Sequence, residues 1–186
     1  MSRVYVFLAN GFETIEALTV VDMLRRVNID VYTVSIQESK MVKSSHRVLV
    51  ESDFILDELD FKDADALILP GGLPGTENLR ECEKLRLILQ EHNKQGTIIG
   101  AICAAPSILG QLGILSGKKA CCYPGYEKDL MGAFISKNET ETDGNIITSR
   151  GMGTSIAFSS AIIDKILSKD ESKKLLDKII YRQSLS

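Results

Sequence analysis

The stretch Ile98-Ile-Gly-Ala-Ile-Cys-Ala-Ala-Pro106 decides the fold, because an apolar run, a single cysteine and a proline follow one another in it. Residues 98–102 are too few and too apolar for a surface helix, so they predict a central parallel strand. Pro106 predicts the first turn of a helix, where a proline needs no N–H partner. Cys103 is therefore expected at a corner between a strand and a helix.

Small residues surround this cysteine, since Ala101, Ala104 and Ala105 flank it. This is the steric requirement of a nucleophile elbow, in which a tight turn lifts one reactive atom clear of the sheet. The N–H groups of the following helix would also favour thiolate over thiol. A free cysteine is often only a small buried hydrophobic residue. The strand, the small neighbours and the helix together favour a reactive Cys103.

Length and composition limit the classes of protein to consider. The chain has 186 residues, 44% of them hydrophobic, and residues 1–186 are expected to form a single domain. Its net charge of -3 offers no basic stripe for nucleic acid. The apolar run at residues 4–9 is far shorter than the ~20 residues that span a bilayer, and no cleavage region follows it. We therefore expect a cytoplasmic protein with neither nucleic acid nor membrane as a partner.

The four cysteines follow no regular spacing and form no C-x-x-C motif. They indicate neither a disulfide framework nor a zinc site, and reduced thiols are expected. Cys82 is expected at a helix start. Cys121 and Cys122 are expected on opposite faces of a strand, with structural roles. The sequence predicts no metal and no cofactor.

Strands and helices alternate along most of the chain, which predicts a doubly wound α/β sandwich with a mainly parallel central sheet and helices on both faces. A turn or an edge hairpin is expected over residues 37–45, leading into residues 47–50. We also expect a solvated His92 near one helix end, and Asp170 as the cap of the last helix. Strands are predicted at residues 3–9, 30–35, 64–69, 98–102, 119–123, 134–136, 139–142 and 145–148, and helices at 15–27, 83–95, 106–112, 154–167 and 170–180.

Such folds bind ligands at the carboxyl ends of their strands. Several polar or glycine-rich segments follow predicted strands and are expected to converge there on one crevice. These segments are Gly11 to Glu16, Gly71-Gly72, Cys103, Tyr123-Pro124 and Arg150-Gly151.

The proton carrier for Cys103 is not an obvious histidine. The two histidines, His46 and His92, both precede the cysteine, so the arrangement of a glutamine amidotransferase is absent and a Cys-His protease is disfavoured. Glu16 is the best-placed carboxylate. It fits an ordinary acidic residue at a helix start, or a buried acid whose raised pKa lets it relay protons for the sulfur.

A thiolate beside a carboxyl group can add to an aldehyde, form a hemithioacetal and shift protons within it. The backbone N–H groups of Gly72 and Ala104 would face the developing oxyanion.

Four motifs in matching order resemble the ThiJ/PfpI superfamily, and within it the branch of the Parkinsonism-associated protein deglycase (the DJ-one branch). The resemblance runs nearly end to end. It implies a flavodoxin-like fold, a homodimer, Cys103 as the elbow nucleophile and Glu16 as its partner. The motifs are Asn10-Gly-Phe-Glu-Thr-Ile-Glu16, Leu69-Pro-Gly-Gly72, Ala101-Ile-Cys-Ala-Ala-Pro106 and Thr148-Ser-Arg-Gly-Met-Gly-Thr154.

The chain also departs from family patterns. The protease-like branch has a histidine directly after the cysteine, where this chain has Ala104. Tyr123 stands where many members place a histidine, and a phenol is a poor base at neutral pH. Met152 occupies a position that is often proline. These departures favour Glu16 as the proton carrier, with Gly71, Gly72, Ala104, Tyr123 and Pro124 as expected substrate-binding residues.

Two functions remain open on these residues. The resemblance implies a glyoxalase or deglycase, which converts methylglyoxal, glyoxal or early glycation adducts to hydroxy acids without a cofactor. The alternative is an oxidative-stress sensor or redox-regulated chaperone that uses Cys103 as its switch, because peroxide attacks an exposed thiolate. Catalysis requires the carboxyl group of Glu16, whereas a sensor does not.

Overall fold

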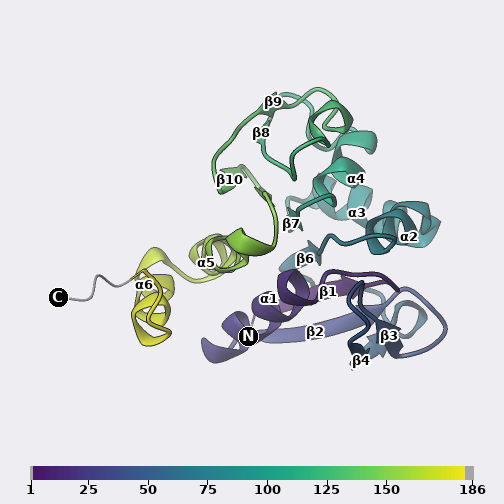
Figure 1. Ribbon diagram of the computed structural model, residues 1–186, viewed down its shortest axis with the longest axis horizontal. Coiled ribbons are helices and arrows are strands. Elements are labelled where there is room, and N and C mark those ends of the chain that lie inside the picture. Colours follow the sequence, from purple (N-terminus) through teal and green to yellow (C-terminus); the bar gives the residue numbers. More distant parts are fainter. Residues whose placement is uncertain (1, 183–186) are drawn as a thin grey trace.

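The computed structural model describes residues 2–182 and contains a seven-stranded sheet in the order β10-β11-β7-β6-β1-β2-β5 (Figure 1). All neighbouring strands are parallel except the β10–β11 hairpin. This confirms the doubly wound α/β fold with a mainly parallel sheet. The strands of this sheet are β1 (Arg3–Leu8), β2 (Asp30–Ser35), β5 (Phe54–Ile55), β6 (Ala66–Leu69), β7 (Ile98–Ile102), β10 (Thr140–Asp143) and β11 (Ile146–Ser149).

Two small sheets and nine helical segments complete the described chain. The small sheets pair β3 (Met41–Lys43) with β4 (Leu49–Glu51), and β8 (Lys119–Ala120) with β9 (Phe134–Ile135). The α-helices are α1 (Thr14–Arg26), α2 (Gly75–Glu81), α3 (Glu83–Gln95), α4 (Pro106–Gln111), α5 (Ser155–Ile166) and α6 (Lys169–Lys178), and the short 3-10 helices are η1 (Leu56–Glu58), η2 (Glu127–Asp129) and η3 (Met152–Thr154).

The helices form two layers because successive strand residues point to opposite faces of the sheet. Tyr5 and Phe7 of β1 pack with the cluster that includes the apolar residues of α2, α3 and α4. Val4 and Val6 pack with the cluster of α1, α5 and α6. The helices lie on the two sides of the sheet in Figure 1. The buried sheet thus fixes the carboxyl ends of β1, β6, β7 and β11 side by side.

The region after β8 differs from the sequence prediction. A strand was expected over residues 119–123, but β8 ends at Ala120. The Cys121 N–H donates to the Thr148 side-chain oxygen at 3.0 Å rather than continuing the ladder. Cys121 and Cys122 are both buried, and all four cysteines are free thiols.

Two details of the predicted helices are also wrong. Ser168, not Asp170, caps α6, because its hydroxyl accepts the Glu171 N–H. His92 is not solvated: its side chain is buried, and Nδ1 lies 3.0 Å from the Thr97 hydroxyl. Helix α2, which follows Pro74 directly, is not among the predicted helices.

Burial of His92 predicts a pH-dependent stability. Desolvation lowers the pKa of His92 below its ordinary value, although the charge of Glu91 opposes this. The unfolded chain therefore binds a proton more readily, and stability is lost as the pH falls below the unfolded pKa of ~6.5. We expect His92→Gln to lose less unfolding free energy than wild type between pH 7.5 and 5.5 in urea titrations. An identical loss in both proteins would contradict this.

Candidate active site

Cys103 lies at the corner between β7 and α4, as expected. Its φ of 65° is in the left-handed region, which a non-glycine residue adopts only when its surroundings enforce it. The Cys103 N–H donates to the Ser149 carbonyl at 3.0 Å, and the Cys103 carbonyl accepts the Tyr123 N–H at 2.8 Å. Pro106 is at the first turn of α4. These contacts hold the elbow and leave the cysteine partly exposed.

Glu16 comes to the same point from α1. Glu13 caps this helix by accepting the Glu16 N–H at 2.7 Å, so the start of the helix is fixed. The Glu16 side chain is only 1% exposed. Its Oε2 accepts the Gly71 N–H at 2.8 Å, while no described residue hydrogen-bonds its buried Oε1. The Cys103 side chain lies beside this carboxyl group, because a Cβ on Gly71 would lie 2.8 Å from the Glu16 Oε2 and 3.1 Å from the Cys103 Sγ.

The sulfur faces two backbone donors. The backbone N–H groups of Gly72 and Ala104 both lower the pKa of the Cys103 thiol. One donor follows β6 and the other follows the elbow, so two neighbouring strands supply them. This is the arrangement that stabilises negative charge on sulfur or on an adjacent oxygen.

Cys103 and Glu16 titrate as a coupled pair. Burial raises the pKa of Glu16 to about 7, against the lowering effects of the Gly71 N–H and Cys103. Burial, followed by the charge of Glu16, raises the pKa of Cys103 to about 12. The backbone N–H groups at the elbow favour a thiolate, as expected, but desolvation and the neighbouring carboxylate raise the pKa of Cys103 by more. After losing its first proton, the pair holds one proton between sulfur and carboxyl.

Gly71 provides the space in which these two groups meet. A Cβ at Gly71 would lie 2.6 Å from the Cys103 Cβ and 2.8 Å from the Glu16 Oε2. Both distances are far below ordinary contact, so one of the two reactive groups would have to move. The position therefore requires a residue without a side chain.

Gly71→Ala is expected to lower turnover by ~10²-fold, since a displacement of about 1 Å at reacting groups has effects of that size. Steady-state kinetics with methylglyoxal, a substrate that the family resemblance implies, would measure it. Gly153→Ala is the matched control, because its added methyl group meets nothing within 4 Å. Equal activity of both variants would contradict the proposed crowding.

The remaining predicted residues lie at the rim. The Tyr123 ring is 51% exposed and lies 3.3 Å from the position of a Cβ on Gly151. Pro124 is exposed beside it. His46 is exposed in the β3–β4 turn, where its Nδ1 lies 3.1 Å from the Ser45 hydroxyl. No contact of the described residues joins His46 to Cys103.

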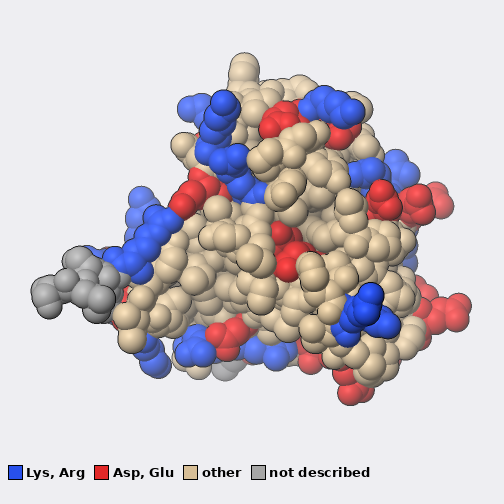
Figure 2. Space-filling model, in the orientation of Figure 1, with Lys and Arg blue, Asp and Glu red and all other residues tan. Residues whose placement is uncertain are grey.

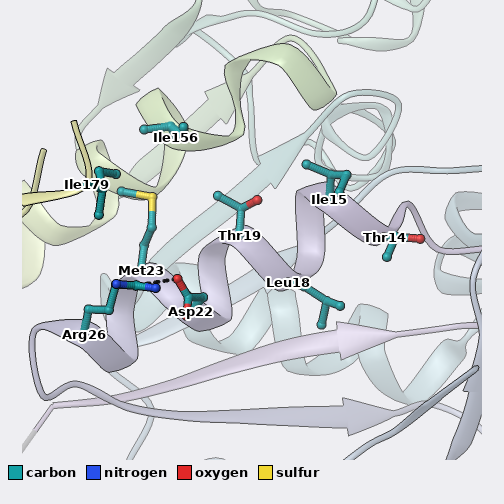
Figure 3. Close-up of a pocket in the computed structure, with 9 residues that line it drawn as sticks. All are labelled: Thr14, Ile15, Leu18, Thr19, Asp22, Met23, Arg26, Ile156 and Ile179. Atoms are coloured by element: carbon teal, nitrogen blue, oxygen red, sulfur yellow. Dashed lines mark hydrogen bonds and ion pairs between the residues drawn. The ribbon is translucent and has the colours of Figure 1, made fainter. Parts of the chain in front are cut away.

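A separate groove of about 560 Å³ lies between α1, α5 and α6 and does not include Cys103 (Figure 3). Asp22 and Arg26 form an ion pair of 2.5 Å on its wall. Ile15, Leu18 and Ile156 contribute apolar surface to it.

Three further observations concern charge, membranes and metals. On the face in Figure 2, charged side chains of both signs lie mostly toward the edges, with some acidic atoms in a recess at the centre. None of the helices within residues 2–182 has the length and hydropathy needed to cross a membrane. In the same part of the chain, no three His, Cys, Asp or Glu side chains are grouped to hold a metal ion.

An elbow cysteine at the carboxyl edge of a doubly wound sheet, paired with a buried glutamate, defines a flavodoxin-like α/β protein with a nucleophile elbow. The sequence matches the DJ-1/PfpI family over residues 2–165, and the chain belongs to that family. This confirms the resemblance inferred from the four motifs.

Individual relatives agree with this assignment. Protein DJ-1 homolog B of Arabidopsis thaliana is 34% identical over 97% of this chain, which spans only 42% of that relative's length. The glutathione-independent glyoxalase DJR-1.2 of Caenorhabditis elegans is 31% identical over 88% of each chain. The structure of oxidized Toxoplasma gondii DJ-1 has a TM-score of 0.94 at 30% identity, covering 98% of this chain and all of that one.

Proposed function

We propose that this protein is a cofactor-independent glyoxalase that converts methylglyoxal or glyoxal to hydroxy acids, and a deglycase that acts on early glycation adducts. The observation that carries the proposal is the buried Glu16 carboxyl group beside the elbow sulfur of Cys103, since a Cβ on Gly71 would lie 2.8 Å from the Glu16 Oε2 and 3.1 Å from the Cys103 Sγ. The similarity to a relative named as a glutathione-independent glyoxalase supports it.

The first step is addition of sulfur to the aldehyde carbon. Glu16 takes the thiol proton, the sulfur electron pair forms the C–S bond, and the aldehyde oxygen gains a proton to give a hemithioacetal. The N–H groups of Gly72 and Ala104 stabilise the negative charge that passes from sulfur to this oxygen. The proton moves only between neighbouring groups.

The second step is a proton shift followed by hydrolysis. The Glu16 carboxylate removes the proton from the former aldehyde carbon and returns it to the neighbouring carbon. The proton of the hemithioacetal hydroxyl passes to the oxygen of that neighbouring carbon, so that the hemithioacetal becomes a 2-hydroxy thioester. Water then cleaves the C–S bond and regenerates the thiol. One methylglyoxal and one water thus give one lactate, with no external oxidant or reductant.

Incubation of the purified protein with methylglyoxal in glutathione-free buffer tests the proposal, with lactate measured over time. We expect multiple turnovers per protein molecule, and glycolate from glyoxal. Release of free amine and hydroxy acid from a freshly glycated peptide tests the deglycase activity separately. The absence of lactate above the protein-free rate would contradict the glyoxalase proposal.

The alternative is an oxidative-stress sensor or redox-regulated chaperone that uses Cys103. A partly exposed, free Cys103 and the likeness to a DJ-1 structure titled as oxidized favour this second role. Peroxide would convert the thiolate to a sulfenate and a second peroxide to a sulfinate, each with release of water. Intact-mass measurements after peroxide treatment, together with aggregation assays on a client protein, would test it.

We also propose that the protein is a cytoplasmic homodimer in which the α1 groove contacts a second copy. Ile15 is 48% exposed there, and Asp22 and Arg26 place charges of both signs on that surface, which suits the self-complementary patch of a two-fold contact. Sedimentation equilibrium should give twice the chain mass of 20.5 kDa. A monomer at all tested concentrations would contradict the dimer.

A further inference from the structure

Arg80 of α2 is connected to the elbow through side-chain and backbone hydrogen bonds. Its Nη2 donates to the Ser107 hydroxyl at 2.8 Å. The buried Arg80 Nε has no partner among residues 2–182, so Ser107 is the only hydrogen-bond partner that the structure describes for this guanidinium. Helix N-termini normally favour negative charge, so the cation of Arg80 next to the start of α4 is unusual. This unusual placement points to a role for Arg80 at the elbow.

Ser107 transmits this contact to the residue after the nucleophile. The fully buried Ser107 hydroxyl donates to the Ala104 carbonyl at 2.6 Å, and the Ser107 N–H donates to the same oxygen at 3.1 Å. The N–H of Ala104 in turn faces the Cys103 sulfur and lowers the pKa of this thiol. The Ala104 carbonyl is thus held by Ser107, while the Ala104 N–H faces the Cys103 sulfur.

The charge of Arg80 strengthens the hydrogen bond from the Ser107 hydroxyl to the Ala104 carbonyl. A hydroxyl that accepts a hydrogen bond from a cation becomes a better donor, because linked hydrogen bonds polarise one another. A tightly held Ala104 carbonyl restricts rotation of the residue that carries the sulfur-facing N–H. Cys103 itself has a positive φ, so the elbow depends on such external restraints.

We propose that Arg80 and Ser107 are positioning residues, which keep the Ala104 N–H directed at the Cys103 sulfur through the series Arg80–Ser107–Ala104–Cys103. The proposal rests on the nucleophilic role of Cys103 in the proposed function. It does not depend on which substrate the cysteine attacks.

Alkylation of Cys103 by iodoacetamide across pH tests this inference without a dicarbonyl. Peptide mass spectrometry should follow the modification, so that the half-buried Cys82 is counted separately. We expect Ser107→Ala and Arg80→Met to slow alkylation at pH 7 by ~3- to 10-fold, since the net contribution of a typical hydrogen bond is of this order. The pH midpoint of the reaction should rise in both variants.

Matched variants separate positioning from simple stabilisation. Ser159→Ala removes a buried hydroxyl that donates to the Ser155 carbonyl at 2.8 Å in α5, and it should leave the alkylation profile unchanged. Ser107→Thr and Arg80→Lys, which keep a donor, should recover most of the wild-type rate. The double variant should react no more slowly than Ser107→Ala alone, because the two residues act in series.

Unchanged alkylation in folded Arg80→Met and Ser107→Ala would overturn the inference, as would additive losses in the double variant. Circular dichroism and thermal melts identify variants that fail to fold, and Arg80→Lys remains informative if Ser107→Ala is one of them. Wild-type protein that forms no lactate, yet shows the expected alkylation shifts, would reject the proposed activity and retain the positioning series.

Discussion

Cys103→Ser should reduce lactate formation from methylglyoxal to the rate measured without protein. The hydroxyl is a far weaker nucleophile than the thiol, and Glu16, with a pKa of about 7, is too weak a base to ionise it. The substitution keeps the size of the side chain, so the strained elbow and its bonds to Ser149 and Tyr123 should persist. Steady-state lactate assays would measure the effect.

Cys82→Ser is the matched control for this prediction. Cys82 is also partly buried and free, but it lies between α2 and α3 and has no contact with the Glu16 carboxyl group among those described. Its variant should keep activity within about twofold of wild type, as expected for a substitution outside the site. Turnover that survives in Cys103→Ser, or that is lost equally in Cys82→Ser, would be inconsistent with the proposed nucleophile.

Glu16→Gln should lower turnover by ~10²- to 10⁴-fold, the usual contribution of a general acid–base group. The amide keeps the shape of the side chain and an acceptor for the Gly71 N–H, but it cannot take up and return a proton. Cys103 should still react with iodoacetamide, because its sulfur and backbone donors remain. Loss of turnover with retained alkylation therefore identifies the carboxyl as the proton carrier.

The wild-type pH profile should show the titration of Glu16. Its raised pKa means that the pair loses its first proton near pH 7, so turnover should rise as the pH increases through that region. An unperturbed glutamate would place this rise near pH 4.5. Glu77→Gln, which changes an exposed acid on α2, should keep the wild-type profile. A profile that is flat from pH 5.5 to 8 would argue against Glu16 as the base.

The sheet was predictable because its strands are short apolar runs bounded by glycine, proline or polar residues. The expected span at residues 30–35 matches β2 without error, and the pattern over 83–95 matches α3. The failures occurred where tertiary contacts override local pattern. Residues 121–123 were expected to extend a strand, but Cys121 donates to a side chain of β11 instead.

The site was predictable in its members and less so in its electrostatics. Cys103, Glu16 and Gly71 follow neighbouring strands or open a helix beside them, so the topology brings them together. The pKa of a thiol depends on burial and on the charge beside it, and neither is visible in the residues that flank Cys103. No sequence pattern points to Ser107 or Arg80 as site residues, because only the packing of α2 on α4 brings the two side chains together.

The most direct test of the central claim is ¹³C NMR of Glu16→Gln mixed with methylglyoxal labelled at its aldehyde carbon. In Glu16→Gln the carboxylate charge that raises the pKa of Cys103 is gone, so the thiol can lose its proton to solvent and still add to the aldehyde. If Cys103 attacks and Glu16 shifts the carbon-bound proton, this variant should accumulate a protein-bound hemithioacetal resonance and produce almost no lactate. Cys103→Ser should show neither signal, and wild type should show labelled lactate. Equal lactate production by wild type and Glu16→Gln, or no bound resonance in the variant, would contradict the account.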